Sequence, residues 1–68
     1  MKVFVVTSAK LMQPEVYEKC FGSFKSAEKY IRSMFPNASK DTPFGNKTSF
    51  LCKDKLGESL MFIHEEEI

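Results

Sequence analysis

The stretch that decides the fold spans residues 23–36 and reads Ser-Phe-Lys-Ser-Ala-Glu-Lys-Tyr-Ile-Arg-Ser-Met-Phe-Pro. At about 100° per residue, the apolar side chains of residues 24–35 fall within one arc of about 140°, which predicts an amphipathic helix. Ser23 is the expected N-cap, because its hydroxyl can accept a hydrogen bond from an early helical N–H. Pro36 ends the helix, and Asn37 is expected to follow it as a left-handed cap.

Two strand-like runs precede this helix and two follow it. Residues 2–7 are β-branched or aromatic at almost every position, which predicts a strand with two apolar faces. Residues 15–21 predict a weaker strand at a sheet edge, with either the odd-numbered residues 17 to 21 or the even-numbered residues 16 to 20 pointing inward. Residues 47–53 and 58–65 predict the remaining two strands.

The connections between these elements are expected to be loops. Residues 8–14 and 36–46 contain the prolines, and residues 54–57 are expected to form a hairpin turn with a left-handed position at Gly57. The predicted fold is α+β, a four-stranded antiparallel sheet with one helix packed on one face, in ββαββ order. A length of 68 residues allows a single domain, residues 1–68.

Both faces of this sheet are expected to be apolar, although one helix covers only one of them. Alternation along residues 3–6 and 60–63 places large apolar side chains on each side. Leaving one side in water forfeits several kcal/mol, at roughly 25 cal/mol per Å². Either Leu11, Met12 and Phe44 from the two long loops cover the second face, or another protein surface does.

The predicted contact surface for such a partner is the face taken to lie away from the helix. Its side chains are Phe4, Val6, Met61 and Ile63. The alternation leaves open which of the two sets the helix covers. The partner is expected to be another protein or a second copy of the chain, which would make it a homodimer.

The residues that carry most enzyme chemistry are sparse. His64 is the one histidine, and no second histidine or HExxH motif completes a zinc site. Cys20 and Cys52 stand 32 residues apart. A catalytic cysteine would need His64 within a few ångströms as its base, and nothing in the sequence places His64 near either thiol, so both are expected to be buried thiols. The three glycines form no phosphate loop. We therefore predict no enzyme, no catalytic residue, no cofactor, no metal and no small-molecule substrate.

The charge balance is close to neutral, with ten basic and nine acidic residues and a net charge of +1. This balance argues against an electrostatic nucleic-acid binder. The alternative hypothesis is a nucleic-acid-associated protein that uses Lys25, Lys29 and Arg32 on one helix face. Residues 1–35 carry six basic and three acidic groups and residues 36–68 carry four and six, a dipolar pattern suited to a charged protein partner.

Only four apolar residues, Val3 to Val6, follow Met1-Lys2, which is too short for a signal peptide or a membrane span. The sequence therefore predicts a cytoplasmic protein without membrane contact.

Residues 1–8, Met-Lys-Val-Phe-Val-Val-Thr-Ser, and residues 20–31, with Phe21, Ala27 and Tyr30-Ile31, resemble small uncharacterised proteins of bacteriophages and prophages. Those proteins open with K-V-Y-V-V-T, continue with V-F-S-x-x-x-x-A-x-x-Y-I, and close on a hairpin with an acidic run, which residues 60–67 resemble. Cys20 departs from the aliphatic residue usual there, and the third strand lacks the family's aromatic signature. The resemblance implies a ββαββ domain and no assigned reaction.

The leading hypothesis is therefore a small non-enzymatic protein-binding module. Under the resemblance, it is a viral accessory protein that binds and modulates, or inhibits, a host protein in the host cytoplasm.

Overall fold

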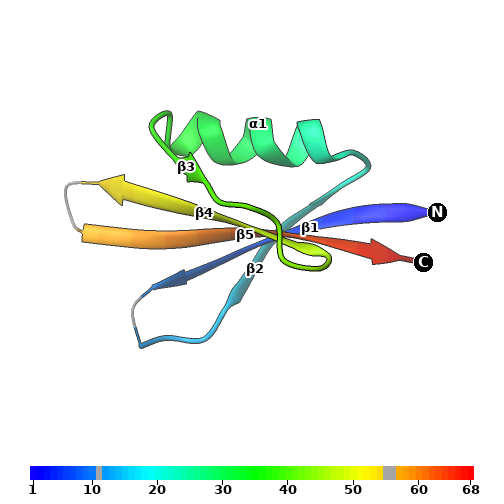
Figure 1. Ribbon diagram of the computed structural model, residues 1–68, viewed down its shortest axis with the longest axis horizontal. Helices are drawn as coiled ribbons and strands as arrows, with labels where there is room; N and C mark the ends of the chain where they lie inside the picture. The colour runs from blue at the N-terminus through cyan, green and yellow to red at the C-terminus, as the bar shows by residue number, and fades with distance from the viewer. Residues whose placement is uncertain (11, 55–56) are drawn as a thin grey trace.

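The computed structural model contains one helix and a five-stranded antiparallel sheet (Figure 1). It describes residues 1–10, 12–54 and 57–68. The strands are β1 (Lys2–Lys10), β2 (Val16–Phe21), β3 (Ser39–Lys40), β4 (Lys47–Asp54) and β5 (Gly57–Glu67), and the helix is α1 (Phe24–Met34). The sheet order is β2-β1-β5-β4-β3, and α1 lies across one face (Figure 1).

The predicted α+β class and the single helix on one face are confirmed, whereas the four-strand count and the ββαββ order are wrong. The additional strand, β3, is two residues long and pairs Ser39 with Leu51 and Lys40 with Phe50. It lies inside the predicted loop 36–46. The chain returning from α1 runs beside β4, so these residues pair although their sequence carries no strand pattern.

Strands β1 and β5 are both longer than predicted. Residues 8–10, expected in a loop, continue β1 because β5 supplies a partner for each of them, from Ser8 opposite Met61 to Lys10 opposite Ser59. Ladder hydrogen bonds satisfy backbone groups that a loop would leave to water. Pairing between β1 and β5 also brings the two chain ends together (Figure 1).

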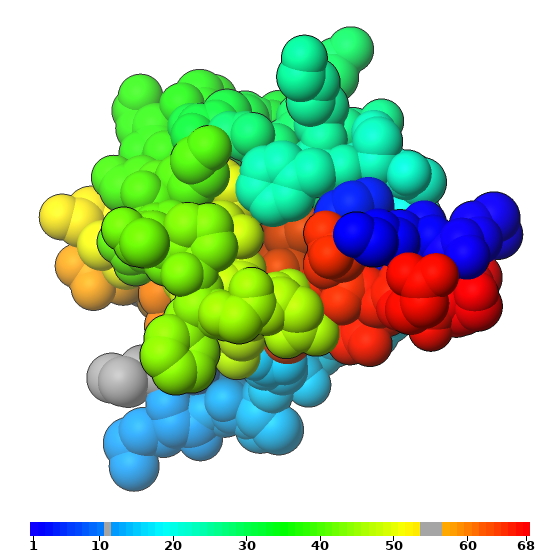
Figure 2. All heavy atoms as spheres, turned by 45° about the vertical axis from the view of Figure 1, so that its right-hand side comes forward, coloured from blue at the N-terminus to red at the C-terminus, as the bar shows by residue number. Residues whose placement is uncertain are grey.

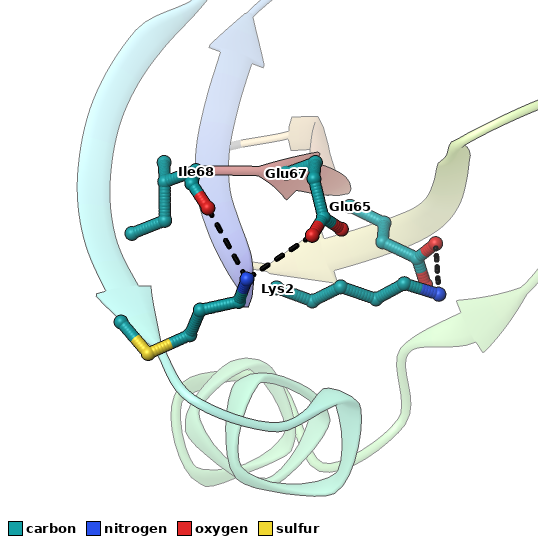
Figure 3. A network of polar contacts seen from close by, with 5 residues as sticks. Lys2, Glu65, Glu67 and Ile68 are labelled. Carbon is teal, nitrogen blue, oxygen red and sulfur yellow. Dashed lines mark hydrogen bonds and ion pairs between the residues drawn. The ribbon is translucent and has the colours of Figure 1, made fainter.

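Polar contacts hold the chain ends in this arrangement (Figure 3). The Met1 ammonium donates to Glu67 Oε1 and to the Ile68 carbonyl, each at 3.1 Å. Next to it, Lys2 Nζ lies 3.3 Å from Glu65 Oε2. All of these groups are exposed, so each pair contributes little stability by itself.

The start of α1 agrees with the sequence prediction, and its end does not. The Ser26 N–H donates to Ser23 Oγ at 3.2 Å, which confirms the N-cap. At the other end the Phe35 N–H donates to the Ile31 carbonyl, and the Ala38 N–H donates to the Phe35 carbonyl. These bonds close the last turn without a left-handed residue, so the prediction for Asn37 is wrong.

The hairpin between β4 and β5 pairs Asp54 with Gly57. Gly57 has a φ of +129°, a region that L side chains rarely adopt, and this confirms the special glycine predicted there. Lys55 and Leu56, which were expected to complete the turn, lie outside the described residues.

The main core lies between α1 and the sheet. It contains Val6, Ala27, Ile31, Ala38, Phe50, Cys52, Met61 and Ile63. The strand register explains this grouping, because Val6 lies opposite Ile63 and Met61 lies opposite Phe50, and paired side chains point to the same face. Partly buried aromatic side chains, from Phe4 to Phe35, pack around this cluster.

The predicted contact set lies beneath the helix and not on the face away from it. Val6, Met61 and Ile63 are almost fully buried in the core, and Phe4 packs beside them. The face assignment was therefore reversed. Phe50 and Cys52 of β4 extend the apolar surface of this side, while the other side gathers polar groups. This difference between the faces follows from the register between the strands and cannot be read from any one strand alone.

Candidate functional site

The sheet face away from α1, here called the open face, is closed at its centre by polar side chains. Glu15 lies just before β2 and binds Lys47 of β4, with 2.8 Å between Glu15 Oε1 and Lys47 Nζ. His64 Nε2 lies 3.3 Å from Glu15 Oε2 and 3.2 Å from Thr7 Oγ1. We call Thr7, Glu15, Lys47 and His64 the polar clasp.

The polar clasp covers Phe62. This ring is only 8% exposed, and Lys47 Nζ lies 4.1 Å from its centroid. Two of the loop residues expected to cover this face do not, since Met12 is 96% and Phe44 88% exposed, and Leu11 lies outside the described residues. Shielding of the second face thus comes partly from the chain itself, through charged side chains.

The clasp requires the sheet to curl. Strands β1 and β5 lie between β2 and β4 in the sheet order, yet Glu15, just before β2, reaches Lys47 at the start of β4. Residues 12–15, which lead into β2, lie on the side of the sheet away from α1 (Figure 1). The two residues are 32 positions apart, and no local pattern could have predicted their contact.

The hydrogen bond from Lys47 lowers the pKa of Glu15 below its ordinary value of 4.5. The positive charge of Lys47 and the contact with His64 act in the same direction, while burial opposes them. Glu15 and Thr7 meet the same ring nitrogen of His64. A catalytic triad instead places the acid on one ring nitrogen and the hydroxyl on the other, so this geometry ties a loop to the sheet without activating Thr7.

The two cysteines lie on different sides of the sheet. Cys52 is buried in the core, as predicted, whereas Cys20 is exposed on β2, so the prediction of a buried thiol is wrong there. Cys52 and His64 face opposite sides, which excludes that pair as a catalytic couple. Val5 of β1 pairs with Cys20 of β2 on one side and with His64 of β5 on the other. Cys20 and His64 are therefore separated by two strand spacings of about 4.8 Å each.

No group of three metal-ligating side chains occurs in the part of the chain that the structure describes.

A groove opens on the open face where the β1–β2 and β4–β5 hairpins end. Its apolar lining consists of Ala9, Met12, Leu51 and Leu60, and its volume is about 820 Å³. Ala9, Leu60 and Leu51 lie side by side across three strands. We call it the hairpin-end groove. The run of apolar residues 60–63 predicted side chains on both faces of the sheet, and the register places Leu60 on the open face and Met61 in the core.

Lys25, Lys29 and Arg32 do share the outer surface of α1, together with Glu28. Arg32, however, is occupied within the fold. Its Nε lies 3.0 Å from Glu28 Oε2, its Nη1 donates to the Ala38 carbonyl at 2.8 Å, and its guanidinium lies 5.7 Å from the Phe50 ring centroid.

No family model, curated protein or solved structure matches this chain. Within residues 1–10, 12–54 and 57–68, no helix combines the length and the apolar character needed to cross a bilayer. What the chain does must therefore be inferred from its own surfaces.

Proposed function

We propose that the chain is a small non-enzymatic protein-binding module that pairs with a second copy of itself through the hairpin-end groove. The observation that carries this proposal is the apolar surface left at the strand ends. Leu60 is 38% exposed, and Met12 projects almost entirely into solvent beside it. An apolar groove with a polar rim is typical of protein interaction sites.

The charges around the groove favour a second copy as the occupant. Lys10 and Glu58 both line it and carry opposite charges. A two-fold axis brings the same patch of both chains together, so that Lys10 of each copy can face Glu58 of the other. Among the described residues, Glu58 has one ion-pair contact, an exposed one of 4.0 Å with Lys53, which competes weakly.

Sedimentation equilibrium over a range of protein concentrations tests this proposal. The unmodified chain should dimerise, and Leu60→Asp should be monomeric with an unchanged circular dichroism spectrum, because a charge would enter the apolar contact. Phe44→Asp is the control, since Phe44 is an apolar side chain even more exposed than Leu60 but lies outside the groove. A chain that stays monomeric at every concentration would overturn the proposal.

A charge exchange sharpens the same test. Lys10→Glu should weaken the dimer by placing like charges together, and adding Glu58→Lys should restore it. Failure of the double variant to recover would exclude the two-fold arrangement described here.

The binding and modulation of a host protein, which the resemblance to phage proteins implies, stays a proposal, as does a cytoplasmic location. A dimer supports such a role in one respect, because it would present every remaining surface twice to a partner and so increase avidity.

The nucleic-acid alternative has no specific observation in its favour. Arg32 is engaged within the fold, and Glu28 lies among Lys25 and Lys29. A fluorescence titration against salt tests it, since phosphate contacts produce a binding constant that falls steeply with salt concentration. Absence of salt-dependent binding would end this alternative.

A further inference from the structure

A second hollow lies on the helix side of the sheet, between the start of α1, the β3–β4 connection and β5 (Figure 2). Its volume is about 350 Å³, at the lower end of the range of small-molecule sites, about 300–1,000 Å³. The lining that matters here consists of Phe4, Phe24, Ile63, Thr48, Lys40 and Glu65. This hollow is separate from the hairpin-end groove and shares no residue with it.

The floor of the hollow is apolar and shaped by aromatic rings. Phe4 and Phe24 meet edge to face, with 6.2 Å between ring centroids and an interplanar angle of 84°. Ile63 from β5 is buried beneath them. Such a floor suits a flat apolar or aromatic group, which can stack or pack against the two rings.

Thr48 places one hydrogen-bonding group in this floor. Its side chain is only 6% exposed, and it lies opposite Ile63 in the strand register. Thr48 Oγ1 makes no hydrogen bond to the described residues. Every side-chain polar atom there that is fully shielded from solvent does make one, so Thr48 Oγ1 is not fully shielded. The hydroxyl therefore keeps its small accessible surface toward the hollow, where a ligand can satisfy it.

The charge at the rim is positive. The Glu65 carboxylate is neutralised by Lys2 at 3.3 Å (Figure 3). Asn46 fixes the Glu65 backbone, because Asn46 Nδ2 donates to the Glu65 carbonyl at 3.0 Å. Lys40 has no carboxylate within ion-pair distance among the described residues, and its Nζ lies 5.8 Å from the Phe24 ring centroid. One uncompensated cation thus stands beside an aromatic floor.

We infer that this hollow binds a small monocarboxylate with an aromatic or branched apolar body. The body packs on Phe4, Phe24 and Ile63, the Thr48 hydroxyl donates a hydrogen bond to the ligand, and Lys40 pairs with the carboxylate. The same chemistry is offered by a free organic acid and by the C-terminal residue of a peptide, so both are used as probes.

Two-dimensional ¹H–¹⁵N NMR titration with phenylacetate tests the inference. Saturable shifts should centre on the amides of Phe24, Thr48 and Glu65. Phenylacetamide, with the same body but no charge, should bind about tenfold more weakly, because it lacks the carboxylate that pairs with Lys40. N-Acetylphenylalanine serves as the peptide-end probe. Tighter binding of this probe assigns the site to a peptide C-terminus, and tighter binding of phenylacetate assigns it to a free acid.

Two variants place the ligand. Lys40→Gln should weaken phenylacetate about tenfold and leave phenylacetamide unchanged, whereas Thr48→Val, which keeps the side-chain shape, should weaken both. Lys29→Gln on the outer face of α1 is the matched charge control and should change neither. Absence of saturable shifts, equal binding of acid and amide, or an equal effect of Lys29→Gln would overturn the inference. Lys40 is exposed, so its variant tests the site even where Thr48→Val unfolds the chain.

Discussion

The two faces of this sheet start from similar strand sequences and are protected in different ways. On the helix face, α1 covers Val6, Ile63 and their neighbours with apolar side chains, and these two side chains are almost fully buried. On the open face, Phe62 is covered by the charged side chains of the polar clasp, and Leu60 remains partly in water. One cover is hydrophobic and continuous, and the other is electrostatic and local.

This difference teaches that a face of a small sheet can be shielded without a second layer of secondary structure. The aliphatic stem of a lysine covers apolar surface while its ammonium stays near water and a carboxylate. Such a cover is weaker than a packed helix and depends on pH. It also leaves the ends of the strands open, which is where the hairpin-end groove lies.

The largest expected difference between the faces is in thiol reactivity. Cys20 should react with a thiol reagent at once, and Cys52 should react at least about 100-fold more slowly, because its exposure requires unfolding at a cost of roughly 3–10 kcal/mol for a chain of this length. Stopped-flow absorbance with Cys20→Ser and Cys52→Ser variants separates the two rates. Equal rates would show that the helix side opens as readily as the other.

A matched pair of valines compares packing on the two faces. Val6→Ala should lower the free energy of unfolding by about 2–3 kcal/mol, because Val6 is fully buried under α1. Val5→Ala, one residue away on the open face, should cost about 1 kcal/mol, since Val5 is only partly buried. Urea denaturation measures both values. A larger loss for Val5→Ala would contradict the assignment of the faces.

The cover on the helix side can be weakened through Arg32. Arg32→Gln should lower the free energy of unfolding by about 1 kcal/mol, because it removes the hydrogen bond to the Ala38 carbonyl and the pair with Glu28. Lys29→Gln on the same helix is the control, with an expected change below about 0.3 kcal/mol. Thermal denaturation followed at 222 nm is the measurement, and equal effects of the two variants would show that Arg32 does not anchor α1.

Breaking the polar clasp on the open face should give the smallest change in the free energy of unfolding, and this change should depend on pH. Glu15→Gln should lower the free energy of unfolding at pH 7 by about 0.5 kcal/mol, a value reduced by the partial exposure of Glu15 and Lys47. The folded-state pKa of Glu15 lies below its ordinary value of 4.5. This contribution is therefore present above the unfolded pKa and is lost as the pH falls through the lowered folded pKa.

Urea titrations from pH 7 to pH 3 check this sign. The two proteins should converge in acid, once Glu15 is protonated in both states of the unmodified chain. Glu66→Gln is the control, because Glu66 makes no ion pair within the described residues. A difference that persists or grows in acid would mean that the clasp does not act through the Glu15 carboxylate.

Local patterns predicted the elements that depend on local physics. The apolar arc of residues 24–35 predicted α1, Ser23 predicted its N-cap, and the alternating runs predicted four of the five strands. Strand β3 was missed, because a two-residue pairing is decided by a neighbour and not by its own side chains. The candidate sites were missed for the same reason, since the clasp and both hollows join residues from distant segments.

The amino-acid sequence by itself determined that the chain contains one amphipathic helix, several strands with apolar side chains on both faces, and an ample set of lysines and glutamates. Only the tertiary structure decided which face α1 covers, because Val6 and Val5 are equally apolar and the choice depends on what β4 and β5 place beside them. It likewise decided that Glu15 meets Lys47 and that Lys40 stands beside Phe24. Contacts of this kind follow from strand order and register, which no local pattern encodes.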